Sequence, residues 1–107
     1  MHELDPARFS IDPHDPEAVE LFEVFAGALG DRVEGLREAF ERGDTRALRR
    51  IAHQLKGAAP GFGCTGVGDA ARRLESAVDQ SDAEALGDLR ARIDALVEEC
   101  RLCMELL

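Results

Sequence analysis

Residues 48–63 read Leu-Arg-Arg-Ile-Ala-His-Gln-Leu-Lys-Gly-Ala-Ala-Pro-Gly-Phe-Gly, and this stretch contains both a helical pattern and its end. At about 100° per residue, its apolar side chains fall on one stripe, at Leu48, Ile51, Ala52, Leu55, Ala59 and Phe62. His53 lies outside that stripe, so it is expected to face water. Pro60 removes a backbone donor and is followed by Gly61 and Gly63. The sequence therefore predicts a helix that kinks or ends between residues 59 and 64, with Phe62 filling the corner.

A long helix is predicted before this stretch, over about residues 16–42. Asp15-Pro16 is typical of an N-cap followed by proline at the first helical position, and Gly43 is a natural stop. Apolar residues recur at steps of three and four, at Val19, Phe22, Ala26, Leu29, Val33, Leu36 and Phe40, with Phe25 widening the stripe. Gly30 is a position where this helix could bend or divide. Residues 1–14, with two Asp-Pro pairs, are expected to form a short capping segment.

Two further helices complete the pattern of four, and each helix after the first has a candidate cap. Asp44 or Thr45 is expected to cap the helix that carries His53, Thr65 to cap the third, and Ser81-x-x-Glu84 matches a capping box for the fourth, with a turn over residues 79–81. The expected inward residues are Val67, Ala70, Ala71, Leu74, Ala77 and Val78 in the third helix, and Leu86, Leu89, Ile93, Leu96, Val97, Cys100, Met104 and Leu107 in the fourth. The fold class is therefore all-α, an antiparallel four-helix bundle. Residues 1–107 are expected to form one domain with a core over about 16–106.

The composition favours a protein partner over a nucleic acid or a membrane. The chain has 107 residues, 45% hydrophobic, and a formal net charge of -9. A phosphate backbone or an anionic membrane requires a concentrated basic surface, which is absent here. There is neither an apolar run of membrane-spanning length nor a signal-peptide pattern at the N-terminus, so the cytoplasm is the expected location.

Three cysteines fit a reducing compartment better than a disulfide framework. Cys100 and Cys103 form a C-x-x-C motif, but they fall within an amphipathic helical pattern. Core packing is therefore expected, and no metal site is predicted. A metal-binding bundle using His53 or Cys64 with Cys100 and Cys103 is kept as an alternative.

The surroundings of His53 suit an incoming phosphate. On a helix, its neighbours one turn away are Arg49, Lys56 and Gly57, so two cations flank the imidazole and one position has no side chain. A neutral imidazole nitrogen is a competent nucleophile near neutral pH. Lys56, with Arg49 or Arg50, could neutralise phosphate oxygens, and Gly57 leaves room for the donor.

The segment Ala52-His53-x-Leu55-Lys56-Gly57-Ala58-Ala59, followed by Phe62-Gly63 and later Leu74-Glu75, resembles the histidine-containing phosphotransfer (HPt) family. The flanking helical pattern extends the match over roughly residues 16–105. The resemblance implies that His53 carries a phosphoryl group on Nε2 between receiver-domain aspartates, or from a histidine kinase. Gln54 joins the candidate residues for phosphate or partner binding. Ala58 and Pro60 depart from the residues usual in the family.

No nucleotide-binding glycine loop and no acidic cluster for magnesium beside His53 are found in the sequence. The expected protein is thus a phosphoryl carrier without a cofactor or kinase machinery of its own. The alternative is an acidic helical adaptor that binds a response regulator without phosphoryl transfer.

Overall fold

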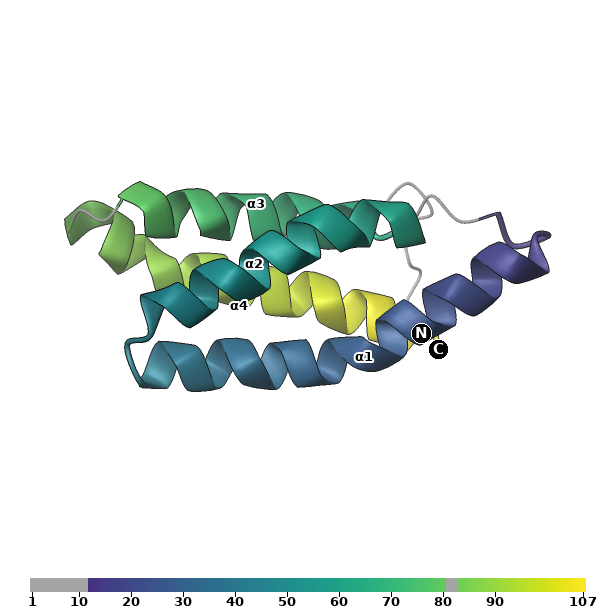
Figure 1. The fold of residues 1–107 in the computed structure, drawn as a ribbon, viewed down its shortest axis with the longest axis horizontal. Helices are drawn as coiled ribbons and strands as arrows, with labels where there is room; N and C mark the ends of the chain where they lie inside the picture. The colour runs from purple at the N-terminus through teal and green to yellow at the C-terminus, as the bar shows by residue number, and fades with distance from the viewer. Residues whose placement is uncertain (1–11, 81–82) are drawn as a thin grey trace.

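The computed structural model describes residues 12–80 and 83–107, with side chains in the last helix described from Asp88 onward. Its elements are α1 (Pro16–Glu41), α2 (Thr45–Ala58), the short 3-10 helix η2 (Ala59–Phe62), α3 (Thr65–Gln80) and α4 (Ala83–Glu105), and no strand occurs among these residues. Each helix runs antiparallel to the one before it (Figure 1). The predicted all-α four-helix bundle is confirmed.

Each helix packs against its neighbours in the chain, and the first and last helices also pack against each other. Helix α2 packs between α1 and α3, and α4 packs between α3 and α1. The N-terminal part of α1 projects beyond the other helices at the end where α3 begins and α4 finishes (Figure 1). Helix α2 therefore exposes a single long face, on which His53 lies. None of the described helices is long and apolar enough to cross a membrane.

Side-chain caps fix the starts of the first two helices. The Asp15 carboxylate accepts hydrogen bonds from the backbone N–H groups of Glu17 and Ala18, at 3.1 and 3.4 Å, and Pro16 occupies the first turn. Asp44 accepts from Ala47 N at 3.0 Å. Between the two helices, Gly43 has φ +66°, which glycine adopts at little cost. The sequence predictions for these boundaries are confirmed.

The end of α2 lies where Pro60 places it. Helix α2 finishes at Ala58, η2 carries the chain through the corner, and Gly63 follows with φ +84°. Phe62 is half-buried, and its ring stacks on Phe25 of α1 with centroids 4.9 Å apart and an interplanar angle of 9°. This aromatic pair fastens the corner to α1.

The core confirms most of the predicted stripes. The fully buried large side chains are Leu29, Leu36, Leu48, Leu74, Leu96, Val67, Cys64, Cys100 and Cys103. Two predictions were wrong. Phe40 is 37% exposed because Ala39 takes the inward position, and Leu107 is 64% exposed because α4 ends at Glu105.

Three predictions about helix boundaries also need correction, and two others concern residues that the structure does not describe. Helix α1 is continuous through Gly30 rather than divided. Thr65 is the first residue of α3, and Gly68 N donates to Cys64 O, so Cys64 occupies the capping position. Helix α3 continues to Gln80, which leaves Asp79 in the helix rather than in a turn. Residues 1–11 of the capping segment predicted over residues 1–14, and the capping box predicted at Ser81, fall outside the described residues.

Candidate functional site

His53 projects from the middle of α2 toward solvent. Its helix is held by the buried residues on either side, Ala52 and Leu55, while the His53 side chain is 65% exposed. The prediction that this histidine faces water is confirmed. An exposed imidazole on a well-anchored helix combines access for a second protein with a fixed position for the ring.

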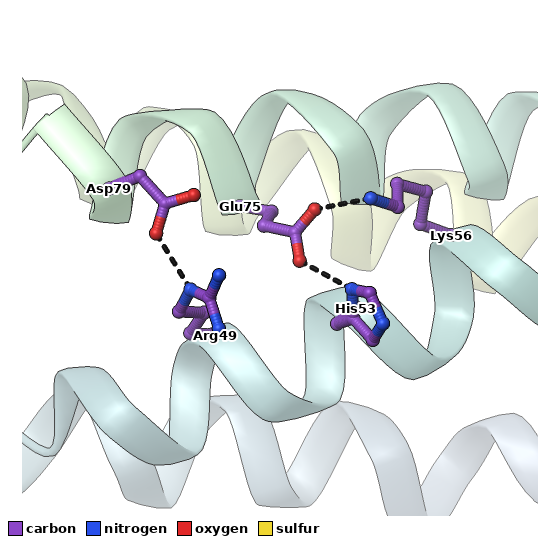
Figure 2. Close-up of polar contacts among 5 residues, drawn as sticks. All are labelled: Arg49, His53, Lys56, Glu75 and Asp79. Atoms are coloured by element: carbon purple, nitrogen blue, oxygen red, sulfur yellow. Dashed lines mark hydrogen bonds and ion pairs between the residues drawn. The ribbon is translucent and has the colours of Figure 1, made fainter.

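One carboxylate on α3 holds both His53 and Lys56. Glu75 Oε2 lies 2.7 Å from His53 Nδ1, and Glu75 Oε1 lies 2.5 Å from Lys56 Nζ. The Glu75 side chain bridges the two residues of α2, as Figure 2 shows. Both oxygens of the carboxylate are thereby used, which fixes its orientation.

Glu75 is the sole charged residue buried among those whose side chains are described, with 7% of its surface exposed. Burial alone would favour the neutral acid. The Lys56 ammonium, through its hydrogen bond, and the His53 imidazole outweigh that effect and lower the pKa of Glu75 below its ordinary value of 4.5. Glu75 is therefore a carboxylate at neutral pH, able to accept hydrogen bonds but not to donate them.

This charge state decides which nitrogen of His53 is nucleophilic. Because an ionised carboxylate only accepts, the close contact with Glu75 requires the hydrogen of the neutral imidazole to be on Nδ1. The lone pair then belongs to Nε2. In Figure 2 this second nitrogen lies on the side of the ring away from Glu75. The arrangement holds the nitrogen with the free lone pair outward, on the exposed side of the ring.

The predicted cations are present near His53, but most are already paired. Lys56 binds Glu75, and Arg49 Nε lies 2.7 Å from Asp79 Oδ1 on α3 (Figure 2). The Asp79 hydrogen bond raises the pKa of Arg49, whose charge is thus retained. Arg50 is exposed on α2, and no ion pair ties it to another described residue. Lys56 is therefore the cation that shares a carboxylate partner, Glu75, with the histidine.

Gly57 and Gln54 define the surface around the imidazole. A Cβ built on Gly57 meets no atom within 4 Å, so this position is open space on α2. The Gln54 side-chain oxygen accepts a hydrogen bond from Arg32 Nη1 of α1 at 2.7 Å. A shallow hollow of about 160 Å³ lies between α1 and α2, lined by Phe25, Ala28, Leu29, Arg32, Gln54, Leu55 and Ala58.

The cysteines lie apart from this site. Cys64, Cys100 and Cys103 are buried and free, which confirms the predicted core packing of the C-x-x-C pair. No group of three or more His, Cys, Asp or Glu side chains able to hold a metal ion is found among the described side chains, those of residues 12–80 and 88–107. The metal-binding alternative thus has no ligand group in this part of the chain.

Comparison with protein-family models gives a match to the Hpt domain over residues 20–101. The chain belongs to the Hpt domain family. No curated protein and no solved structure matched the chain. Hpt domains are phosphoryl carriers in two-component phosphorelays, in which the phosphoryl group is carried on histidine, and they are not kinases.

Glu75 is the residue of this Hpt site to which sequence reasoning gave no role. Its sequence signal was its place in the apolar stripe of α3, between Ala71 at i-4 and Val78 at i+3. A carboxylate on a buried helical face needs a partner. The sequence does not show which residues of α2 supply it, because that depends on how the two helices pack.

Proposed function

We propose that His53 is the phosphoacceptor of this Hpt domain and that it carries the phosphoryl group on Nε2. The observation that supports this most strongly is the contact of Nδ1 with the buried Glu75 carboxylate, at 2.7 Å, in a side chain that is otherwise exposed. Glu75 acts as a positioning residue. It selects the Nδ1–H tautomer and keeps Nε2 pointing outward.

The proposed transfer is a displacement at phosphorus. The Nε2 lone pair forms the N–P bond while the bond from phosphorus to the aspartyl oxygen of the donor breaks, and the aspartate leaves as a carboxylate. The imidazole gains positive charge as Nε2 is phosphorylated, and the ionised Glu75 at Nδ1 offsets that charge. Reversal of the same step returns the phosphoryl group to another carboxylate.

Lys56 contributes a second electrostatic effect. Its Nζ lies 2.5 Å from Glu75 Oε1, and its side chain remains 36% exposed. The ammonium keeps Glu75 ionised from the inner side, and its remaining N–H donors are available to phosphate oxygens on the solvent side. Arg49 and Arg50 are proposed as more distant sources of positive charge that attract the phosphorylated partner.

We propose a receiver domain, a histidine kinase, or both as partners. The docking face that we propose is made of Leu21, Val24 and Phe25 on α1 together with the hollow next to Gln54, the residue that follows His53. Leu21 is 48% exposed and Val24 68%, and Phe25 continues their helical row into the hollow. The open space at Gly57 allows a partner to approach the imidazole closely. Magnesium and the remaining transfer machinery are expected to come from the partner.

The test is transfer from a phosphorylated receiver domain to the purified chain. The wild-type protein should acquire an acid-labile, base-stable label, and His53→Gln should remain folded and unlabelled. His14→Gln is the matched control because His14 is also exposed, in the turn before α1, and has no proposed role. A folded His53→Gln protein that still accepts the label would refute the assignment. A wild-type protein that binds receivers without ever being labelled would instead support the phosphate-independent adaptor.

We also propose that residues 1–107 form one such domain, with its core over about 16–106, and that it works in the cytoplasm. The three free, buried cysteines are compatible with a reducing compartment.

A further inference from the structure

Two cysteines distant in sequence meet inside the bundle. The sulfur atoms of Cys64 and Cys103 lie 3.0 Å apart, and the residues are separated by 39 positions along the chain. Both residues are buried, with 0% and 1% of their surface exposed. Neither belongs to the site around His53, and no part of the proposed phosphotransfer uses them.

Their positions at helix ends make the two thiols chemically different. Cys64 occupies the N-cap position of the 16-residue helix α3, where the helix dipole favours a thiolate. The Cys103 thiol donates to Cys64 Sγ, and this hydrogen bond lowers the pKa of Cys64 while raising that of Cys103. The pair thus contains one sulfur suited to be a nucleophile and one suited to remain a thiol.

Cys100 is a natural comparison within the same core. It lies one turn before Cys103 on α4, and it is also fully buried. Burial raises the pKa of the Cys100 thiol to about 12. Cys100 therefore shares the environment and the helix of Cys103, but it has neither a helix N-terminus nor a sulfur-to-sulfur hydrogen bond in the described residues.

We propose that Cys64 and Cys103 form an oxidisable dithiol site, which a hydroperoxide converts into an intramolecular disulfide. The Cys64 thiolate attacks the peroxide, the O–O bond breaks, and Cys64 becomes a sulfenic acid. The Cys103 thiol then gives up its proton and its sulfur attacks the Cys64 sulfur, so that the S–S bond forms, the S–O bond of the sulfenic acid breaks and the hydroxide leaves with that proton as water. The two thiols together lose two electrons and two protons, and one hydrogen peroxide becomes two waters.

The same geometry indicates how the oxidant enters and what the bond does. Cys103 lies in the last turn of α4, which ends at Glu105, and helix ends open more readily than helix centres. The start of α3 and the end of α4 lie at the same end of the bundle (Figure 1). A disulfide there would join α3 to α4 and restrict the unfolded chain by closing a loop of 39 positions.

The experiment treats the folded, full chain with hydrogen peroxide and maps the cysteines under non-reducing conditions. We expect a mass loss of about 2 Da, for the two hydrogens lost, a linked peptide pair containing Cys64 and Cys103, and an alkylatable Cys100 after unfolding. The midpoint temperature of thermal unfolding should rise by about 10 °C and return to the starting value on reduction with dithiothreitol.

Matched variants make the result specific. Cys100→Ala should still form the bond, whereas Cys64→Ala and Cys103→Ala should not, and all three carry the same type of truncation. The wild-type peptide map is informative even if one variant fails to fold. The proposal is overturned if the linked peptides include Cys100, if the bond joins two chains, if oxidation stops at a sulfenic acid, or if all three thiols remain reduced in the folded protein. Because the phosphoacceptor is not involved, these outcomes are independent of the proposed function.

Discussion

Two carboxylates of α3, one helical turn apart, contact side chains of α2. Only one of them is buried enough to orient the side chain that it contacts. Glu75 and Asp79 each lie 2.7 Å from a nitrogen of α2, on His53 and Arg49 respectively. Their surroundings differ, because the Glu75 side chain is 10% exposed and the Asp79 side chain 51%. Two ion-pair contacts of equal length can therefore differ in strength.

The difference arises from solvent. Water screens the Asp79–Arg49 pair and competes for both partners, so exposed ion pairs of this kind contribute little to stability. Glu75 has exchanged most of its water for two protein partners, and losing either of them leaves a buried group poorly satisfied. The buried pair can therefore orient an imidazole, whereas the exposed pair adds positive charge near it.

The largest effect among changes to these pairs is expected for Glu75→Gln. The amide keeps the shape of the side chain but removes the charge that selects the His53 tautomer and offsets charge on the phosphorylated ring. We expect the single-turnover rate of phosphorylation to fall about tenfold and the free energy of unfolding to fall by about 1 kcal/mol. An unchanged rate in a folded protein would show that Glu75 has no positioning role.

A smaller loss is expected for Lys56→Ala. This change removes the cation that binds Glu75 and that is proposed to assist phosphate without a bond to the transferred group. The transfer rate at saturating partner should fall about fivefold without being abolished. Arg50→Ala is the matched control, since Arg50 is an exposed cation on the same helix. Equal losses in both variants would indicate a general effect of surface charge instead.

The pH dependence of stability should report the charge of the buried Glu75 carboxylate. Since the folded-state pKa of Glu75 is lowered, its contribution is present above the ordinary value of 4.5 and is lost as pH falls through the folded value. The stability difference between wild type and Glu75→Gln, measured by urea unfolding, should persist at neutral pH and shrink below pH 4.5. A difference that grows on acidification would contradict the assigned direction.

The smallest effect is expected for Asp79→Asn. The variant loses one exposed ion pair with Arg49, and we expect the midpoint of thermal unfolding to change by about 2 °C at most. The transfer rate should stay within about twofold of wild type. An effect as large as that of Glu75→Gln would abolish the distinction between the two pairs.

Much of the fold follows from local signals in the sequence. Asp15, Asp44 and Pro60 set helix boundaries through groups close to them in the chain, and the apolar stripes identify the buried faces. The errors occurred near helix ends. Phe40 lies in the last turn of α1, where Ala39 takes the inward position, and Leu107 lies beyond the end of α4, so both are exposed.

The candidate site was only partly predictable, for a physical reason. The exposure of His53 and the spacing of Lys56 and Gly57 are properties of one helix. The contact with Glu75 and the pairing of Arg49 with Asp79 depend on the register between α2 and α3, which no single helical pattern specifies. Sequence reasoning therefore assigned the cations to an incoming phosphate, whereas the structure shows Lys56 and Arg49 bound to carboxylates.

The most direct test of the central claim is NMR of protein labelled with ¹⁵N in its histidine side chains, before and after phosphorylation by a small phosphoryl donor. We expect His53 to hold its hydrogen on Nδ1 beforehand and to carry the phosphoryl group on Nε2 afterwards, while His2 and His14 are unchanged. Phosphorylation of His53 at Nδ1, or modification of another histidine in its place, would contradict the account.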